Sequence, residues 1–156
     1  MIVLGIDPGT AITGYGVVTG DARKQVLLEC GVIRTDARAP LAERLAVIFD
    51  GVSEIVCRHS PERLAVERAF YSRNVHTTLV LGHARGVILL AGARAGLAID
   101  EFEPALIKKT VVGVGGATKE QVQFMTARLL RLKTAPSPAD AADGVAAALT
   151  ALLRAS

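Results

Sequence analysis

The chain has 156 residues, of which 51% are hydrophobic and 21% are charged. These proportions support a packed core and exclude global disorder, and the length predicts a single domain over residues 1–156. The formal net charge of +3 permits a polyanionic partner without requiring one. The longest strongly apolar stretch, residues 86–93, is much shorter than the roughly 20 residues of a membrane span, so we expect no membrane association.

The N-terminus and the cysteines indicate where the protein works. Residues 1–6 have no basic lead and Asp7 interrupts their apolar run, a pattern that does not fit a secretory signal. Cys30 and Cys57 have no metal-binding spacing, so we expect neither a disulfide framework nor a structural zinc site. These features predict a soluble, cytoplasmic protein with reduced thiols.

The first 34 residues predict three strands. A strand at Ile2–Asp7 leads into the turn Pro8-Gly9-Thr10. A second strand over about 13–19 and a third over 25–34 flank a hairpin tip at residues 21–24. The hairpin predicts an antiparallel edge of a sheet.

A helix and a fourth strand follow. Pro40 suits the first turn of this helix. The apolar residues that recur at helical spacing are Leu41, Leu45, Ile48, Val52, Ile55 and Val56. Pro61 ends the helix, and Leu64-Ala65-Val66 is apolar on both faces, as in a buried parallel strand. That strand ends on Glu67.

A long helix is predicted from about Asn74 to Ala95, followed by a strand at 97–102. Between residues 79 and 91 its apolar side chains cover most of the circumference, so the helix is either central to the core or shared with a partner subunit. Close backbone packing, within the core or across a dimer, is suggested by the series Gly82, Gly86 and Gly92.

The last third predicts helices. Residues 107–112 are ambiguous, but Thr118 suits the N-cap of a helix with Gln121 at the capping-box position. Pro136-Ser137-Pro138 then breaks the chain before a final helix. The whole order of elements is that of an α/β protein.

Four carboxylates stand where folding alone does not require acid. Asp7 and Glu67 each end an apolar strand, and Asp140 and Asp143, three residues apart, project from one face of the last helix. The carboxyl ends of neighbouring strands converge on one crevice, so we expect the four side chains to meet. Without a bound cation their mutual repulsion would raise their pKa values. Such oxygen ligands suit Mg²⁺ or Mn²⁺.

Each acid also has a simpler interpretation. Asp7 before Pro-Gly could be a turn former, and Glu67 could pair with Arg68 or Arg73. The two acids of the last helix could simply interact favourably with the positive, N-terminal end of its helix dipole. Together these interpretations weaken, because each would place acid at the same end of the fold by chance. Setting the four aside leaves 11 of the 15 acidic side chains against 18 basic ones, as expected for a metal-dependent enzyme acting on nucleic acid.

Five short motifs follow one another over nearly the whole chain. They are Gly5-Ile6-Asp7-Pro8-Gly9-Thr10 with Thr13-Gly14-Tyr15-Gly16, Ala65-Val66-Glu67 with Phe70, Gly82-His83-Ala84-Arg85-Gly86, Lys108-Lys109-Thr110-Val111-Val112-Gly113 and Asp140-Ala141-Ala142-Asp143. The first motif alone occurs in unrelated proteins. In this order and spacing, the five together resemble the RuvC family of Holliday-junction resolvases.

The resemblance implies an α/β protein of the ribonuclease H-like fold, with a mixed five-stranded sheet flanked by helices. It implies a homodimer whose two active sites cut two opposed strands of four-way junction DNA during recombination and repair. The products would be ligatable 5′-phosphate and 3′-hydroxyl ends. The branch-migration complex RuvAB is the partner that the resemblance implies.

Residue by residue, the resemblance assigns metal binding and catalysis to Asp7, Glu67, Asp140 and Asp143. Some relatives carry His at the position of Asp140, so either member of the last pair is a candidate for direct metal contact. Our hypothesis places two divalent cations, Mg²⁺ or Mn²⁺, between these acids. One would activate water for in-line attack and the other would stabilise the leaving 3′-oxygen.

The candidates for contacting nucleic acid are Phe70, Tyr71, Arg73, Lys108, Lys109 and Lys119. The resemblance assigns Phe70 to stacking on bases, and Lys108 and Lys119 to the active-site region. An exposed aromatic ring beside a basic groove can stack on an unpaired base, with Tyr71 as the second choice. Arg73 is either a phosphate contact or a solvated loop residue. Lys109, which follows Lys108, could share the role of Lys108.

Two other functions stay open. A non-catalytic binder of branched DNA would need the basic residues but would have no use for four converging acids. A nuclease of the same fold that acts on RNA–DNA hybrids or precursor RNA would share the chemistry. The matches at Phe70 and the lysines favour the junction.

Overall fold

Strands and helices alternate along the chain, which the computed structural model describes for residues 1–68 and 72–155. The strands are β1 (Ile2–Asp7), β2 (Ile12–Gly20), β3 (Gln25–Arg34), β4 (Arg63–Glu67) and β5 (Ala98–Phe102). The helices are α1 (Leu41–His59), α2 (Val75–Arg94), α3 (Pro104–Val112), α4 (Lys119–Leu129) and α5 (Ala139–Arg154). The predicted order is confirmed, and the ambiguous segment 107–112 is helical.

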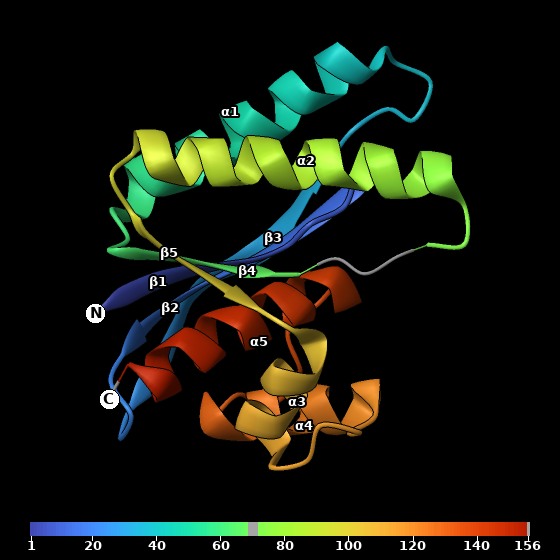
Figure 1. The fold of residues 1–156 in the computed structure, drawn as a ribbon. Helices are drawn as coiled ribbons and strands as arrows, with labels where there is room; N and C mark the ends of the chain where they lie inside the picture. Colours follow the sequence, from blue (N-terminus) through green and yellow to red (C-terminus); the bar gives the residue numbers. More distant parts are fainter. Residues whose placement is uncertain (69–71, 156) are drawn as a thin grey trace.

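The five strands form one mixed sheet in the order β3-β2-β1-β4-β5 (Figure 1). β1 pairs with β2 and β2 with β3 in antiparallel fashion, whereas β4 runs parallel to both β1 and β5. This is the predicted mixed sheet with an antiparallel, hairpin-built edge. Because β1 and β4 are parallel neighbours, Asp7 and Glu67 end their strands at the same edge of the sheet.

α5 lies directly against β1 and β2, and glycines make this approach possible. A Cβ atom on Gly14 would overlap the carbonyl oxygen of Asp140 at the start of α5. A Cβ on Gly144 would lie 2.6–2.9 Å from three backbone atoms of Tyr15 in β2. The first turns of α5 are therefore fixed to the sheet by backbone contact.

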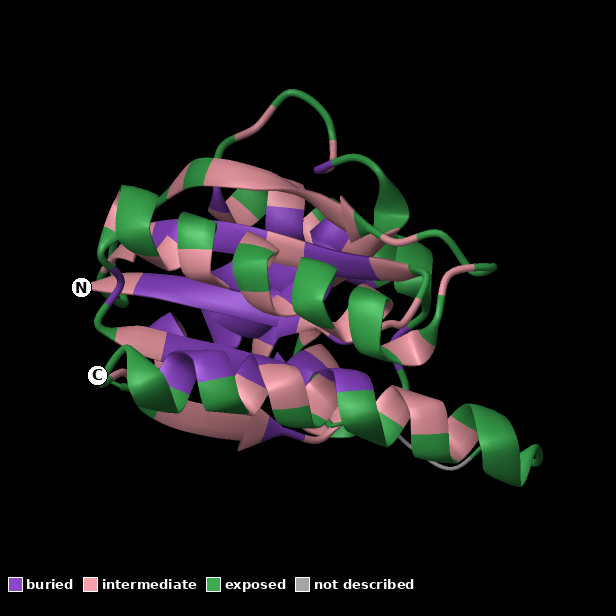
Figure 2. Ribbon diagram, turned by 90° about the horizontal axis from the view of Figure 1, so that it is seen from above, coloured by how far each residue is buried: buried purple, intermediate pink, exposed green. Residues whose placement is uncertain are grey.

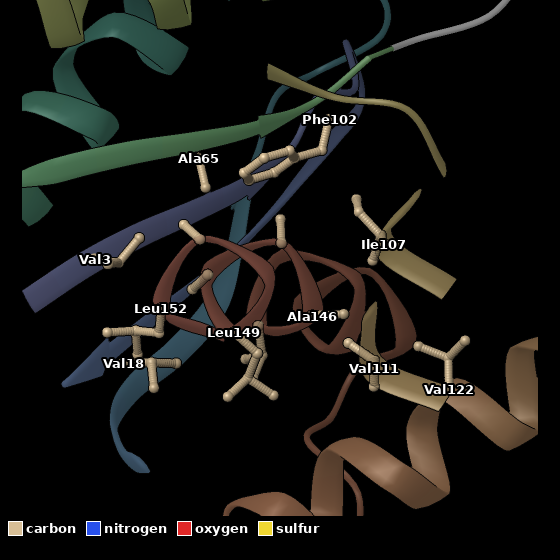
Figure 3. Packing of buried hydrophobic residues seen from close by; sticks show 14 of the residues in the cluster. Val3, Val18, Ala65, Phe102, Ile107, Val111, Val122, Ala146, Leu149 and Leu152 are labelled. Atoms are coloured by element: carbon tan, nitrogen blue, oxygen red, sulfur yellow. The ribbon is translucent and has the colours of Figure 1, made fainter. Parts of the chain in front are cut away.

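The core on this face of the sheet, the α5 face, surrounds the long row of alanines in α5 (Figure 3). Leu149 and Leu152 of α5 are buried with Val3, Ala65 and Phe102 of three different strands. α3 and α4 pack against α5 from the other side. The small side chains allow a helix to be buried on nearly all sides without separating the layers.

α1 and α2 cover the opposite face of the sheet, with the buried strands beneath them (Figure 2). Buried Ala84, Ile88 and Ala91 hold α2 in place. α2 is also long and apolar enough to cross a membrane, by length and composition only. Core helices of soluble proteins meet the same test, so this is weak evidence for a span, and the absence of membrane association stays a prediction.

Local capping sets where α4 begins. Thr118 Oγ1 accepts a hydrogen bond from the Gln121 backbone N–H at 3.2 Å, and Gln121 Oε1 accepts one from the Thr118 N–H at 2.8 Å. The predicted capping box is confirmed. Its consequence is positional, because it makes Lys119 the first residue of the helix.

We expect Gly144→Ala to destabilise the protein by about 3 kcal/mol, because the new methyl group meets rigid backbone of β2 rather than a flexible side chain. Urea unfolding would measure the change. Gly116→Ala is the matched control, since nothing lies within 4 Å of a Cβ placed there. Equal stability of the two variants would contradict the close contact.

Candidate active site

The carboxyl ends of β1 and β4 and the start of α5 form one side of a pocket of about 240 Å³. Asp7, Glu67 and Asp143 supply three carboxylates to it, from three elements. α3 and α4 supply Lys108 and Lys119. The remaining lining residues, which the sequence did not single out, are Pro104, Ile107, Val122 and Ala146.

The turn after Asp7 is held by another residue. Thr13 is fully buried, and its hydroxyl donates to the Gly9 carbonyl at 2.6 Å while accepting from the Gly9 N–H at 3.4 Å. Within the described part of the chain, the Asp7 carboxylate makes no hydrogen bond to this turn. The structure therefore gives Asp7 no turn-forming contact and leaves its carboxylate to the pocket.

Glu67 is likewise not engaged by the neighbouring arginine. Arg68 pairs with Glu103 at 2.9 Å and approaches Glu101 at 3.9 Å. The Arg68 N–H donates to the Phe102 carbonyl at 2.8 Å, which continues the pairing of β4 with β5 past Glu67. The alternative of a Glu67–Arg68 ion pair is wrong, because the side chains of these two successive residues point to opposite faces of the sheet.

Burial and repulsion by neighbouring acids make Asp7 and Glu67 hard to ionise. Burial, followed by the charges of Glu67, Asp143 and Asp140, raises the pKa of Asp7 to about 8. Burial first and then the charge of Asp143 raises the pKa of Glu67 to about 7, against the opposing effect of the two lysines. The rise expected for carboxylates that meet without a cation is thus present at Asp7 and Glu67.

Lys119 supplies positive charge inside this cluster. Its Nζ donates to Asp143 Oδ2 at 2.8 Å, and this hydrogen bond raises the lysine pKa. Asp140 is half-buried and does not line the pocket, but its charge contributes to the shifts of both Asp7 and Lys119. Asp143 is therefore the member of the α5 pair that faces the pocket, with Asp140 behind it.

The donor set fits a divalent cation by its chemistry. The pocket presents carboxylate oxygens, the ligands that Mg²⁺ and Mn²⁺ prefer. The raised pKa values of Asp7 and Glu67 come first from burial and then from repulsion, and a bound cation would offset that repulsion. As they stand, no three acidic, histidine or cysteine side chains of residues 1–68 and 72–155 are arranged to enclose an ion. Asp143 is instead paired with Lys119, and both line the same pocket.

The predicted nucleic-acid contacts fall in different places. Lys108 lines the pocket, whereas Lys109, one residue further along α3, is exposed and lies outside its lining. Arg73 is exposed just before α2 and has no ion-pair partner within the described part of the chain. Phe70 and Tyr71 lie outside the described residues. The contact roles of all of these side chains stay predictions.

We expect Asp7→Asn to stabilise the metal-free protein by about 2 kcal/mol or more at pH 8. The native Asp7 carboxyl holds its proton up to about pH 8, whereas the unfolded one ionises near 3.8, so the parent loses stability as pH rises between these values. Asparagine does not titrate. Urea unfolding with chelator at pH 4 and pH 8 would measure this, and a stability difference that shrinks with rising pH would contradict it.

Comparisons with known proteins agree with this geometry. A family model described as "Crossover junction endodeoxyribonuclease RuvC" matches residues 3–151. A protein of that description from Halorhodospira halophila is 50% identical over 94% of this chain and 87% of its own. Another protein of that description, from Heliobacterium modesticaldum, is 48% identical over 96% of this chain and 92% of its own.

A solved structure, "T. thermophilus RuvC in complex with Holliday junction substrate", superposes with a TM-score of 0.94 at 38% identity. The match covers 99% of this chain and 94% of the other. The sheet and its flanking helices therefore form the ribonuclease H-like fold that the sequence predicted. With nearly its whole length matched in all three comparisons, the chain belongs to the RuvC family of crossover junction endodeoxyribonucleases.

Proposed function

We propose that this protein resolves Holliday junctions by nicking two opposed strands of a four-way DNA junction, leaving 5′-phosphate and 3′-hydroxyl ends. The observation that carries the proposal is the pocket in which three carboxylates meet two lysines. Family membership implies dependence on a divalent metal. We assign the work to one cytoplasmic nuclease domain over residues 1–156 that acts with the branch-migration complex RuvAB.

Asp7, Glu67 and Asp143, with Asp140 behind them, are the residues that would hold Mg²⁺ or Mn²⁺, with two ions in each site. Such ions, when bound, supply positive charge that stabilises the phosphate as its bond to the leaving oxygen breaks. The carboxylates must be ionised for this, and the raised pKa values of Asp7 and Glu67 couple the loss of their protons to ion binding.

The lysines of the pocket act on the substrate phosphate. Lys119 is charged at neutral pH, because its bond to Asp143 raises its pKa, and it can exchange that carboxylate for a phosphate oxygen. Lys108 reaches the same space from α3. Ile107 and Val122 close one wall with apolar surface, which limits water and strengthens each charge interaction inside.

The competing functions make different demands on this pocket. A non-catalytic binder of branched DNA would carry repelling, buried acids that oppose its own ligand. A nuclease of RNA–DNA hybrids would share the acids, so only the substrate separates it from a junction resolvase. The similarity to a structure solved with a Holliday junction favours the junction.

Cleavage assays would test this directly. With Mg²⁺ or Mn²⁺, we expect paired nicks in opposed strands of a labelled four-way junction, sealable by ligase and absent with chelator. Asp7→Asn should lose cleavage and keep junction binding, because it removes a ligand and a repelling charge together. Asp50→Asn, an exposed acid of α1, is the control and should cut normally. Cleavage of an RNA–DNA hybrid in place of the junction would overturn the substrate assignment.

The proposed homodimer is supported by the outer face of α2. Val75, Leu79 and Leu90 are 72%, 60% and 53% exposed. Between them, Gly82 and Gly86 have no atom within 4 Å of the point where a Cβ would stand, so no other described part of the chain covers these positions. An exposed apolar stripe of this kind marks an interaction surface, and a second copy of α2 across a two-fold axis would cover it.

We expect Gly86→Arg to convert the dimer to a monomer, because a long charged side chain would stand in the helix-to-helix contact. Sedimentation velocity would measure the mass. Leu28→Arg is the control, since Leu28 is an exposed apolar residue on β3, at 44%, away from α2. A Gly86→Arg protein that sediments as the parent dimer would remove α2 from the interface.

A further inference from the structure

Arg34, at the end of β3, projects from the same face of the sheet as the pocket carboxylates. Arg34 pairs with Ile12 on β2, and Gly14, two residues further along β2, pairs with Asp7 on β1. Directly paired residues, and residues two apart on one strand, share a face. A Cβ on Gly14 would point at the first turn of α5, so this shared face is the α5 face.

The register also gives the approximate separation of these residues. Arg34 and Asp7 are two strands apart, about 10 Å, and two residues apart along the strand direction, about 7 Å. Their backbones are thus about 12 Å from each other. Successive phosphates of one DNA strand advance about 3.4 Å along the duplex axis and also wind around it, so this separation spans at most about four nucleotides.

The segment after Arg34 is fastened to the turn that follows Asp7. The Thr35 N–H donates to the Ala11 carbonyl at 3.0 Å, and the Thr35 hydroxyl donates to the Thr10 carbonyl. Arg44 of α1 donates from Nε to the same hydroxyl at 3.2 Å. These bonds fix the end of β3 relative to the β1 strand end, so the place of Arg34 does not depend on a free loop.

The Arg34 side chain has no partner within the described residues. It is exposed and makes no ion pair or side-chain hydrogen bond there. Lys108 and Lys119 lie on the other side of the α5 start, on α3 and α4. In Figure 1 the end of β3, the end of β4 and the start of α5 all lie at the right of the molecule. Arg34 thus stands on the β2–β3 side of the pocket, across from the lysines.

We propose that Arg34 binds a backbone phosphate of the cleaved strand, within about four nucleotides of the phosphate that is cut. The proposal rests on the proposed nuclease function, and it gives the strand a second cationic contact on the side of the pocket away from the lysines. Held on both sides, the strand would be aligned across the carboxylates. Arg34 is then a positioning residue, without a role in the bond-breaking step.

Binding to a four-way junction as a function of salt, without divalent ions, is the first test. Arg34→Ala should weaken binding several-fold and lower the slope of log affinity against log salt by about one phosphate contact. Arg34→Lys should keep most of the slope. Arg23→Ala is the matched control, because Arg23 is exposed in the hairpin at the opposite end of β3. Equal slopes for Arg34→Ala and Arg23→Ala would overturn the proposal.

A neutral phosphate provides the second test, in which each protein is compared with itself on the unmodified junction. Methylphosphonates would be placed one at a time at the four phosphates on each side of the cut site. One of them should weaken binding of the parent several-fold and leave Arg34→Ala unaffected. Equal losses for both proteins at every position would refute the contact. A parent protein that neither binds nor cuts the junction would instead refute the proposed function.

Discussion

The contact between α5 and the first two strands is the constraint on which this molecule depends. It is made by backbone against backbone, because Gly14 and Gly144 leave no room for side chains where the layers meet. A helix held this closely cannot slide or rotate without breaking its packing on both sides. The contact with the sheet therefore fixes the positions of the acids of α5. It places Asp143 beside the strand-end carboxylates of Asp7 and Glu67, which are far away in sequence.

The same closeness creates an electrostatic problem at the sheet edge. Three carboxylates share one half-buried pocket, and the pKa of Asp7 is raised first by burial and then by the charges of its acidic neighbours. The structure answers in part with Lys119, which the capping box fixes as the first residue of α4 and which reaches Asp143. The pocket is thus less stable than an uncharged one would be, as is common where binding requires charges to be held in place in advance.

Much of the fold and of the acid site could be predicted from the sequence because the signals are local. Apolar strands that end in acid, the Thr118–Gln121 capping box and the proline break before α5 each act within a few residues. The segment that forms α3 was ambiguous because Pro104–Val112 is too short to show a helical repeat of apolar residues. The stability of this short helix depends on its packing against α5. A resemblance in sequence likewise could not place Lys109 outside the pocket.

Other features depend on pairing that no local pattern encodes. The separation of Arg34 from the acids follows from the register of three strands, including one irregular step between β2 and β3, and is invisible until the sheet is known. Glu67 could be assigned to Arg68 from sequence proximity, yet the alternation of the strand sends the two side chains to opposite faces. The apolar circumference of α2 did not separate a core role from a partner contact, and the structure shows one side of the helix buried and another apolar side exposed.

The sheet separates the two surfaces that the proposed enzyme needs. The carboxylates open on the α5 face, and α2 lies on the other face. In a dimer joined through α2, the path between the two pockets crosses a sheet, two helix layers and a second sheet, at about 10 Å for each packed pair. Two cutting centres on the order of 30 Å apart cannot share one phosphate. The fixed distance between the two centres would therefore select the substrate, because only DNA that offers two equivalent strands at that spacing can occupy both centres at once.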